Sequence, residues 1–195
     1  RFVLAFQLLF HDALDEADVT MRAALADAER IGDVTLQARC LTYVMAIQRR
    51  RGEVASTEDW ATRTLAIATK AKMLDYAGAA EANLAWVAWR RGDTDVADTR
   101  VREALDVWKK LSPAYPYPLQ WMALLLATAL DLEGGRVTEC VDHARAMLEP
   151  KQQRLPEPLE SALTAAIAAS AEGDLDQCRE RLANAVQTAR KLDYL

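Results

Sequence analysis

A spacing of about 40 residues between turns constrains the fold of this chain more than any other feature. The turns are His11-Asp12, Gly52-Glu53, Gly92-Asp93, Gly135-Arg136 and Gly173-Asp174. A small residue follows each turn, and these positions are Ala17, Thr57, Ala97, Cys140 and Cys178. An aliphatic residue stands eight positions later, at Leu25, Leu65, Leu105, Leu148 and Val186, and both series step by 40, 40, 43 and 38 residues. Such self-similarity predicts stacked units, because one unit can bury its apolar faces only against its neighbours.

Each unit is predicted to be a pair of antiparallel helices. The clearest one spans residues 79–111, where apolar residues recur at three- and four-residue intervals on both sides of Gly92. Gly92 can adopt the left-handed conformation that ends a helix. The predicted helices are Phe2–Phe10, Leu14–Ile31, Leu36–Arg51, Thr57–Lys72, Tyr76–Arg91, Val96–Leu111, Leu119–Glu133, Thr138–Leu148, Glu157–Ala171 and Asp176–Leu192. The predicted fold class is therefore all-α, an α-α superhelix of about five antiparallel helical hairpins.

The whole chain, residues 1–195, is expected to form a single repeat domain. Its units are roughly residues 1–33, 34–74, 75–115, 116–155 and 156–195. The sequence Lys191-Leu192-Asp193-Tyr194 resembles Met73-Leu74-Asp75-Tyr76, where a predicted helix begins. Neither end carries the polar capping repeat with which such stacks normally close, so we expect a fragment of a longer protein.

Composition argues against several classes of function. The net charge of −5 and the pI near 5.2 are unfavourable for a surface that binds nucleic acid or an anionic membrane. No apolar run reaches the roughly 18–20 residues that a membrane span needs. The cysteines Cys40, Cys140 and Cys178 are odd in number and have no paired spacing, which indicates a reduced, cytoplasmic protein. The only histidines, His11 and His143, lie on separate hairpins without metal-binding spacing, so we expect no metal, no cofactor, no catalytic residue and no enzyme.

The candidate binding residues lie on the first helices of two successive hairpins, which should line a concave groove. They are Arg39, Tyr43, Asn83, Trp86, Trp89 and Arg90. Arginine and tryptophan are the residues that most often anchor an interface. A groove of this kind would suit a peptide with a carboxylate or a flat polar ligand. The alternative is that Trp86 and Trp89 only fill the space between repeats.

A proline-bearing link, Ser112-Pro-Ala-Tyr-Pro-Tyr-Pro118, interrupts the helical pattern. Its prolines favour an extended backbone. The link could form a binding lip that carries Tyr115 and Tyr117, or it could bridge two hairpins with its tyrosines packed down. An enzyme-like pocket closed by this link, with Glu81 as a buried carboxylate, is an alternative function. A purely structural spacer between effector domains is another.

The pattern Leu84-Ala85, Gly92-Asp93, Ala97 and Ala104-Leu105 resembles the tetratricopeptide repeat. Longer repeats of this look are similar to those of bacterial multidomain regulators: the large ATP-binding LuxR-type and maltose activators, the antibiotic regulatory proteins and some nucleotide cyclases. The resemblance implies an interaction or ligand-sensing scaffold in signalling or transcription regulation, whose partner is a protein, a peptide or a small-molecule inducer. The carboxylate clamp of the family is incomplete, because Thr42 and Ala46 stand where Lys and Asn should accompany Asn83.

Overall fold

The structure, a computed structural model, describes residues 1–112 and 117–195. In this part of the chain it contains ten helices and no strand, which confirms the all-α prediction. The helices are α1 (Phe2–Phe10), α2 (Leu14–Ile31), α3 (Val34–Arg50), α4 (Val54–Lys70), α5 (Leu74–Arg90), α6 (Thr94–Lys109), α7 (Trp121–Glu133), α8 (Val137–Met147), α9 (Glu157–Ala171) and α10 (Leu175–Lys191).

The repeated turns adopt the conformation that the sequence indicates. Gly52, Gly92, Gly135 and Gly173 have φ between 72° and 85°, and Asp12 has φ 62° at the corresponding point of the first hairpin. The small residue after each turn has no exposed surface, so it packs inside the stack of helices. Helices α3 to α6 begin two or three residues earlier than predicted, because the turns before them are shorter than expected. At α3 the Asp33 carboxylate accepts a hydrogen bond from the Leu36 amide at 2.9 Å and caps the helix.

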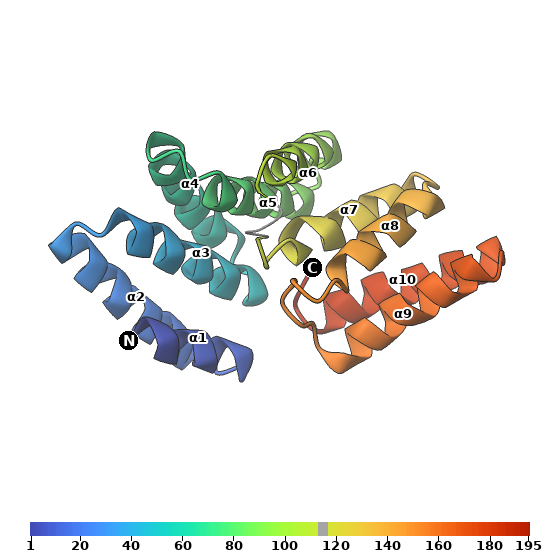
Figure 1. Cartoon of the computed structure of the whole chain (residues 1–195), viewed down its shortest axis with the longest axis horizontal. Helices are drawn as coiled ribbons and strands as arrows, with labels where there is room; N and C mark the ends of the chain where they lie inside the picture. Colours follow the sequence, from blue (N-terminus) through green and yellow to red (C-terminus); the bar gives the residue numbers. More distant parts are fainter. Residues whose placement is uncertain (113–116) are drawn as a thin grey trace.

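The helices are arranged in an arch, with α1 and α2 at one end and α9 and α10 at the other (Figure 1). Consecutive helices pack against each other, and α3, α5 and α7 also contact one another in that order. Helix α7 lies at the centre, and every residue from Trp121 to Asp131 is buried. The C-terminus lies inside the arch (Figure 1).

The last hairpin departs from the regular stack. In the part of the chain that the structure describes, α10 contacts both α7 and α8, whereas α9 contacts α8 and α10 but not α7. The inner position of the final unit is therefore occupied by its second helix. This hairpin follows the link at residues 148–156, which is longer than the turns of the earlier repeats. The Gln153 amide donates to the Pro118 carbonyl at 2.9 Å, so this link lies beside the proline-bearing one.

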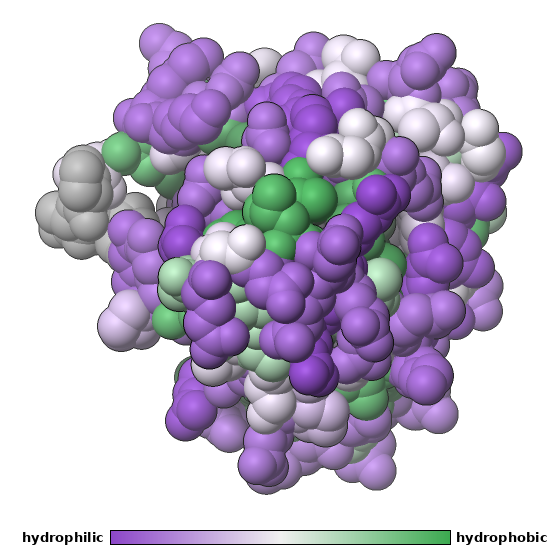
Figure 2. Space-filling view, turned by 90° about the vertical axis from the view of Figure 1, so that its right-hand side faces the viewer, coloured by the Kyte–Doolittle hydropathy of each residue, from purple (hydrophilic) through white to green (hydrophobic). Residues whose placement is uncertain are grey.

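On the side that faces right in Figure 1, hydrophilic side chains cover most of the surface, and the most prominent apolar patch lies near the centre of the view (Figure 2). Among the described residues, no helix is both long enough and apolar enough to cross a membrane.

Candidate functional site: a cavity inside the arch

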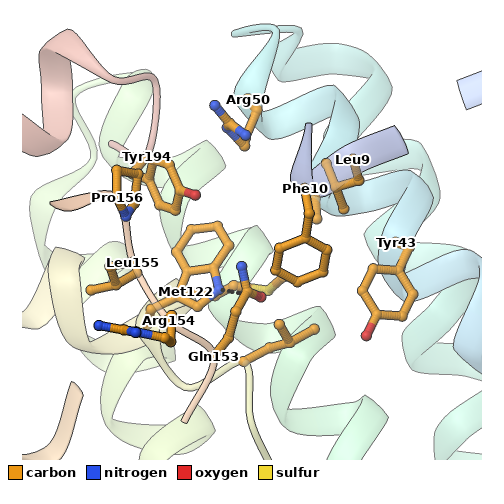
Figure 3. A pocket seen from close by; sticks show the side chains of 13 residues that line it. Leu9, Phe10, Tyr43, Arg50, Met122, Gln153, Arg154, Leu155, Pro156 and Tyr194 are labelled. Atoms are coloured by element: carbon orange, nitrogen blue, oxygen red, sulfur yellow. Dashed lines mark hydrogen bonds between the residues drawn. The ribbon is translucent and has the colours of Figure 1, made fainter. Parts of the chain in front are cut away.

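A cavity of about 270 Å³ lies inside the arch, where its two halves face each other (Figure 3). It is lined by Leu9, Phe10, Tyr43, Ala46, Arg50, Leu119, Trp121, Met122, Gln153, Arg154, Leu155, Pro156 and Tyr194. The lining comes from α1, α3, the start of α7, the 148–156 link and the C-terminal tail. Segments far apart in the sequence therefore form one wall.

The helical spacing of α3 presents three of these side chains together. Tyr43, Ala46 and Arg50 are separated by three and four residues, which places them on one helix face. Ala46 leaves room between its two large neighbours. Phe10 reaches the same space from the last turn of α1 (Figure 3). The cavity thus has an apolar wall with one guanidinium at its edge.

Aromatic rings hold both sides of the cavity. Tyr43 packs edge-on against Phe6 with centroids 5.3 Å apart. On the opposite wall, the Trp121 and Tyr194 rings lie 4.8 Å apart, and Trp121 Nε1 donates to Gln153 Oε1 at 3.3 Å. Burial raises the pKa of Tyr43 to about 12, so its hydroxyl is a neutral hydrogen-bond donor at neutral pH. Both tyrosines line the cavity, and within the described residues neither the Tyr43 nor the Tyr194 hydroxyl has a hydrogen-bond partner.

Arg49 lies behind the wall formed by Trp121 and Tyr194, and it connects α3 to α7 and to the C-terminal tail. Its guanidinium donates to the Met122 carbonyl at 2.8 Å and to the Tyr194 carbonyl at 3.2 Å. The same group lies 5.3 Å from the centroid of Trp121 and 5.6 Å from that of Trp86. Burial lowers the pKa of Arg49 to about 9, which still leaves it charged at neutral pH. Arg49 therefore places a buried positive charge beside the cavity, and in the described structure no carboxylate pairs with it.

Arg50 borders the cavity itself. Its side chain is 13 % exposed and lies 4.6 Å from the centroid of the Tyr194 ring. It pairs with Asp12 Oδ1 at 2.9 Å, and it donates to the Leu192 carbonyl at 3.4 Å. Its Nε is buried and has no partner in the described structure. Part of the hydrogen-bonding capacity of Arg50 is thus unused.

Of the six residues that the sequence singles out, only Tyr43 lines this cavity. Arg39 is exposed at the edge of the arch, where it contacts Tyr76 Oη at 3.4 Å and the Phe2 ring. Trp89 is half-buried under Arg190, and Arg90 is exposed and covers Trp86 at 4.9 Å.

Asn83 and Trp86 have no exposed surface and lie between α5 and its neighbours. Asn83 donates to the Ala79 carbonyl at 2.8 Å and contacts the Met122 sulfur at 3.4 Å. Its Oδ1 and the Trp86 Nε1 have no hydrogen-bond partner among the described residues. In this conformation the Trp86 ring fills the space between repeats, which is the alternative that the sequence left open for it.

Of the two tyrosines in the proline-bearing link, the structure describes Tyr117. Tyr115 lies outside the described residues. Tyr117 is buried and stacks on Trp108 with centroids 5.3 Å apart, and burial raises its pKa well above the ordinary value. Glu81 does not line the cavity, and its carboxylate pairs with Arg100 at 2.6 Å.

A second polar cluster surrounds Asp131 on the outer side of α7. Its carboxylate is fully buried and accepts hydrogen bonds from Arg102 at 2.6 Å and Arg136 at 2.7 Å, and His143 Nε2 lies 2.9 Å from it. Burial alone would raise the pKa of Asp131, but these hydrogen bonds outweigh it and hold the pKa below the ordinary value. Cys40, Cys140 and Cys178 are free, fully buried thiols. Among the described residues, no group of three or more His, Cys, Asp and Glu side chains could hold a metal ion.

Sequence reasoning missed most of the cavity. Phe10, Gln153 and Tyr194 were not considered for binding. Arg50 and Trp121 were considered but not selected, and for Arg50 the reason was that a cation at the end of a helix is explained by the helix dipole. The proline-bearing link was noted, but its contact with the link at residues 148–156 was not predicted. A signal existed in the interruption of the repeat by prolines, since a break in a regular stack is where a non-repetitive surface can form.

A comparison with models of known protein families finds no match, and a search of curated proteins finds no similar sequence.

Proposed function

We propose that this protein is a binding scaffold that holds its ligand or partner in the cavity inside the arch. The observation that carries the proposal is a concave site of about 270 Å³ with four aromatic rings and unpaired polar groups. Binding sites are typically concave and mostly apolar, with a few polar groups that fix the orientation of the ligand. The site also joins both halves of the arch, so an occupant would contact α1, α3, α7 and the C-terminal tail at once.

The resemblance to tetratricopeptide repeats supports placing this scaffold in a bacterial regulatory or signalling protein. A ligand that bridges the two halves would favour one curvature of the arch over others, which is how a sensor domain would transmit binding. The three reduced, buried cysteines are compatible with a cytoplasmic location. The function proposed is therefore non-enzymatic ligand or partner recognition.

Blocking the cavity tests this proposal. The native thiols are buried, and burial raises the pKa of Cys40 to about 11 and that of Cys140 to about 12, so a Gln153→Cys variant would react at its new thiol first. The unlabelled variant, the variant labelled with a bulky maleimide, and a Thr99→Cys variant labelled on the outer face of α6 would each be screened against small molecules and short peptides. Nuclear magnetic resonance would report binding.

We expect ligands to be lost when the label is at position 153 and kept when it is at position 99. Ligands that bind all three proteins equally would show that the cavity is not the binding site, and the proposal would then be wrong.

A further inference from the structure

The charge of the cavity wall is opposite to that of the whole chain. The net charge of the chain is −5, yet the thirteen lining residues include Arg50 and Arg154 and no Asp or Glu. Arg49, directly behind Trp121 and Tyr194, adds a third guanidinium that no carboxylate pairs with in the described structure. Water-poor surroundings strengthen the interaction of such charges with an occupant. The charged side chains that line the cavity are therefore all positive.

Arg50 is the guanidinium that an occupant could reach. Its carboxylate partner Asp12 is 70 % exposed, so this ion pair lies at the rim and adds little stability. Exchange of Asp12 for the carboxylate of a ligand would replace a solvent-exposed pair with one inside the cavity. Arg154, by contrast, already pairs with Glu160 at 3.1 Å and is largely exposed.

The remaining wall fits an aromatic body. Phe10, Tyr43, Trp121 and Tyr194 line the same space from α1, α3, α7 and the C-terminal tail. The volume of about 270 Å³ lies just below the usual range for drug-sized ligands, so a molecule with one or two rings fits better than a long chain.

We propose that the occupant is a small aromatic carboxylate, with its ring among the four aromatic side chains and its carboxylate on Arg50 in place of Asp12. This inference rests on the proposed function and specifies its ligand class.

Three probes of nearly equal shape test it: phenylacetate, phenylacetamide and phenethylammonium. Each would be titrated into the full chain, with tryptophan fluorescence and nuclear magnetic resonance as readouts. Phenylacetate should bind most tightly, and its affinity should fall at higher salt because the interaction is ionic. Arg50→Gln should weaken phenylacetate binding by about tenfold to a hundredfold, as expected for a charged hydrogen bond, and should leave the affinity for phenylacetamide nearly unchanged.

Arg91→Gln is the matched control, because Arg91 stands at the end of α5, pairs with the carboxylate of Glu58 at 2.6 Å as Arg50 pairs with Asp12, and does not line the cavity. It should leave phenylacetate binding unchanged. Asp12→Asn removes the competing carboxylate, and asparagine tolerates the left-handed conformation at that position. This variant should bind phenylacetate several-fold more tightly, which a purely structural role for Arg50 would not produce.

Equal affinity for the three probes, or binding of phenylacetate that Arg50→Gln does not weaken, would overturn the inference. Absence of binding by all three probes would overturn it as well. The proposed function is judged separately, because ligands lost on blocking position 153 would support the cavity as a site whatever their charge.

Discussion

Gly78 of α5 lies against the Trp108 side chain of α6, and replacing it with alanine should destabilise the protein. A Cβ at this position would lie 2.5 Å from Trp108 Nε1, 2.7 Å from Cε2 and 2.9 Å from Cδ1. The indole cannot move aside freely. Its Nε1 donates to the Asp75 carbonyl at 2.9 Å, its ring stacks on Tyr117, and only 4 % of the residue is exposed.

The magnitude follows from opposing effects. Alanine in a helix is favoured over glycine by about 1 kcal/mol. Overpacking a rigid site costs about 1–3 kcal/mol, and displacing the indole from its carbonyl partner costs about 1 kcal/mol more. We therefore expect Gly78→Ala to lower the free energy of unfolding by about 1–3 kcal/mol, whereas helix propensity alone predicts an increase.

Urea denaturation followed by circular dichroism would measure the effect in two backgrounds. In the wild-type background alanine should destabilise. In a Trp108→Leu background the clash is absent, so the same substitution should be neutral or stabilise by up to about 1 kcal/mol. A Gly78→Ala protein that is more stable than the wild type, or an equal loss in both backgrounds, would refute the reasoning.

Three further predictions follow from the buried polar groups. Asp131→Asn should destabilise by about 2 kcal/mol, a reduced value because two of its cationic partners are partly exposed. The pKa of Asp131 is lowered in the folded state, so the ionised carboxylate stabilises the protein above its unfolded pKa near 3.8. The difference in the free energy of unfolding between the wild type and the variant should therefore disappear as the pH falls through the folded pKa. An undiminished difference in urea titrations at acidic pH would contradict this. Arg49→Lys should destabilise the protein by about 2 kcal/mol, and by more than Arg49→Met does. Lysine keeps a buried charge but cannot donate to the Met122 and Tyr194 carbonyls at once. Thermal melts that reverse this order would count against the bridging role of Arg49. The Tyr43 hydroxyl has a pKa near 10 in the unfolded state and about 12 in the folded state, so the folded state binds more protons between these pH values. The free energy of unfolding should therefore fall as the pH rises from 10 to 12, and it should fall less steeply in Tyr43→Phe. Equal slopes for the two proteins would argue against the raised pKa.

Local features predicted the helices and their order. The turns at Gly52, Gly92, Gly135 and Gly173 depend on a left-handed backbone that glycine adopts without strain, so their positions can be read from the residue type. The small residues after the turns are all buried, because helical spacing fixes which face they share. Boundaries shifted by two or three residues where short turns began helices early.

The tertiary arrangement decided the rest. Nothing in the repeat distinguishes Gly78 from a weak helix residue, and only the position of Trp108 shows the close approach. The inner place of α10 beside α7 depends on how two irregular links hydrogen-bond to each other, which no periodic pattern encodes.

For the candidate site too, the sequence determined the local features that helical spacing encodes, and it did not determine the contacts between distant segments. It predicted a concave scaffold, and it named Tyr43 because helical spacing determines which side chains share a face. It did not predict the cavity, whose wall depends on Arg49 hydrogen-bonding to residues 73 and 145 positions further along the chain. Contacts over such separations arise from the curvature of the whole arch, so the placement of Arg50, Trp121 and Tyr194 around one space is a property of the tertiary structure alone.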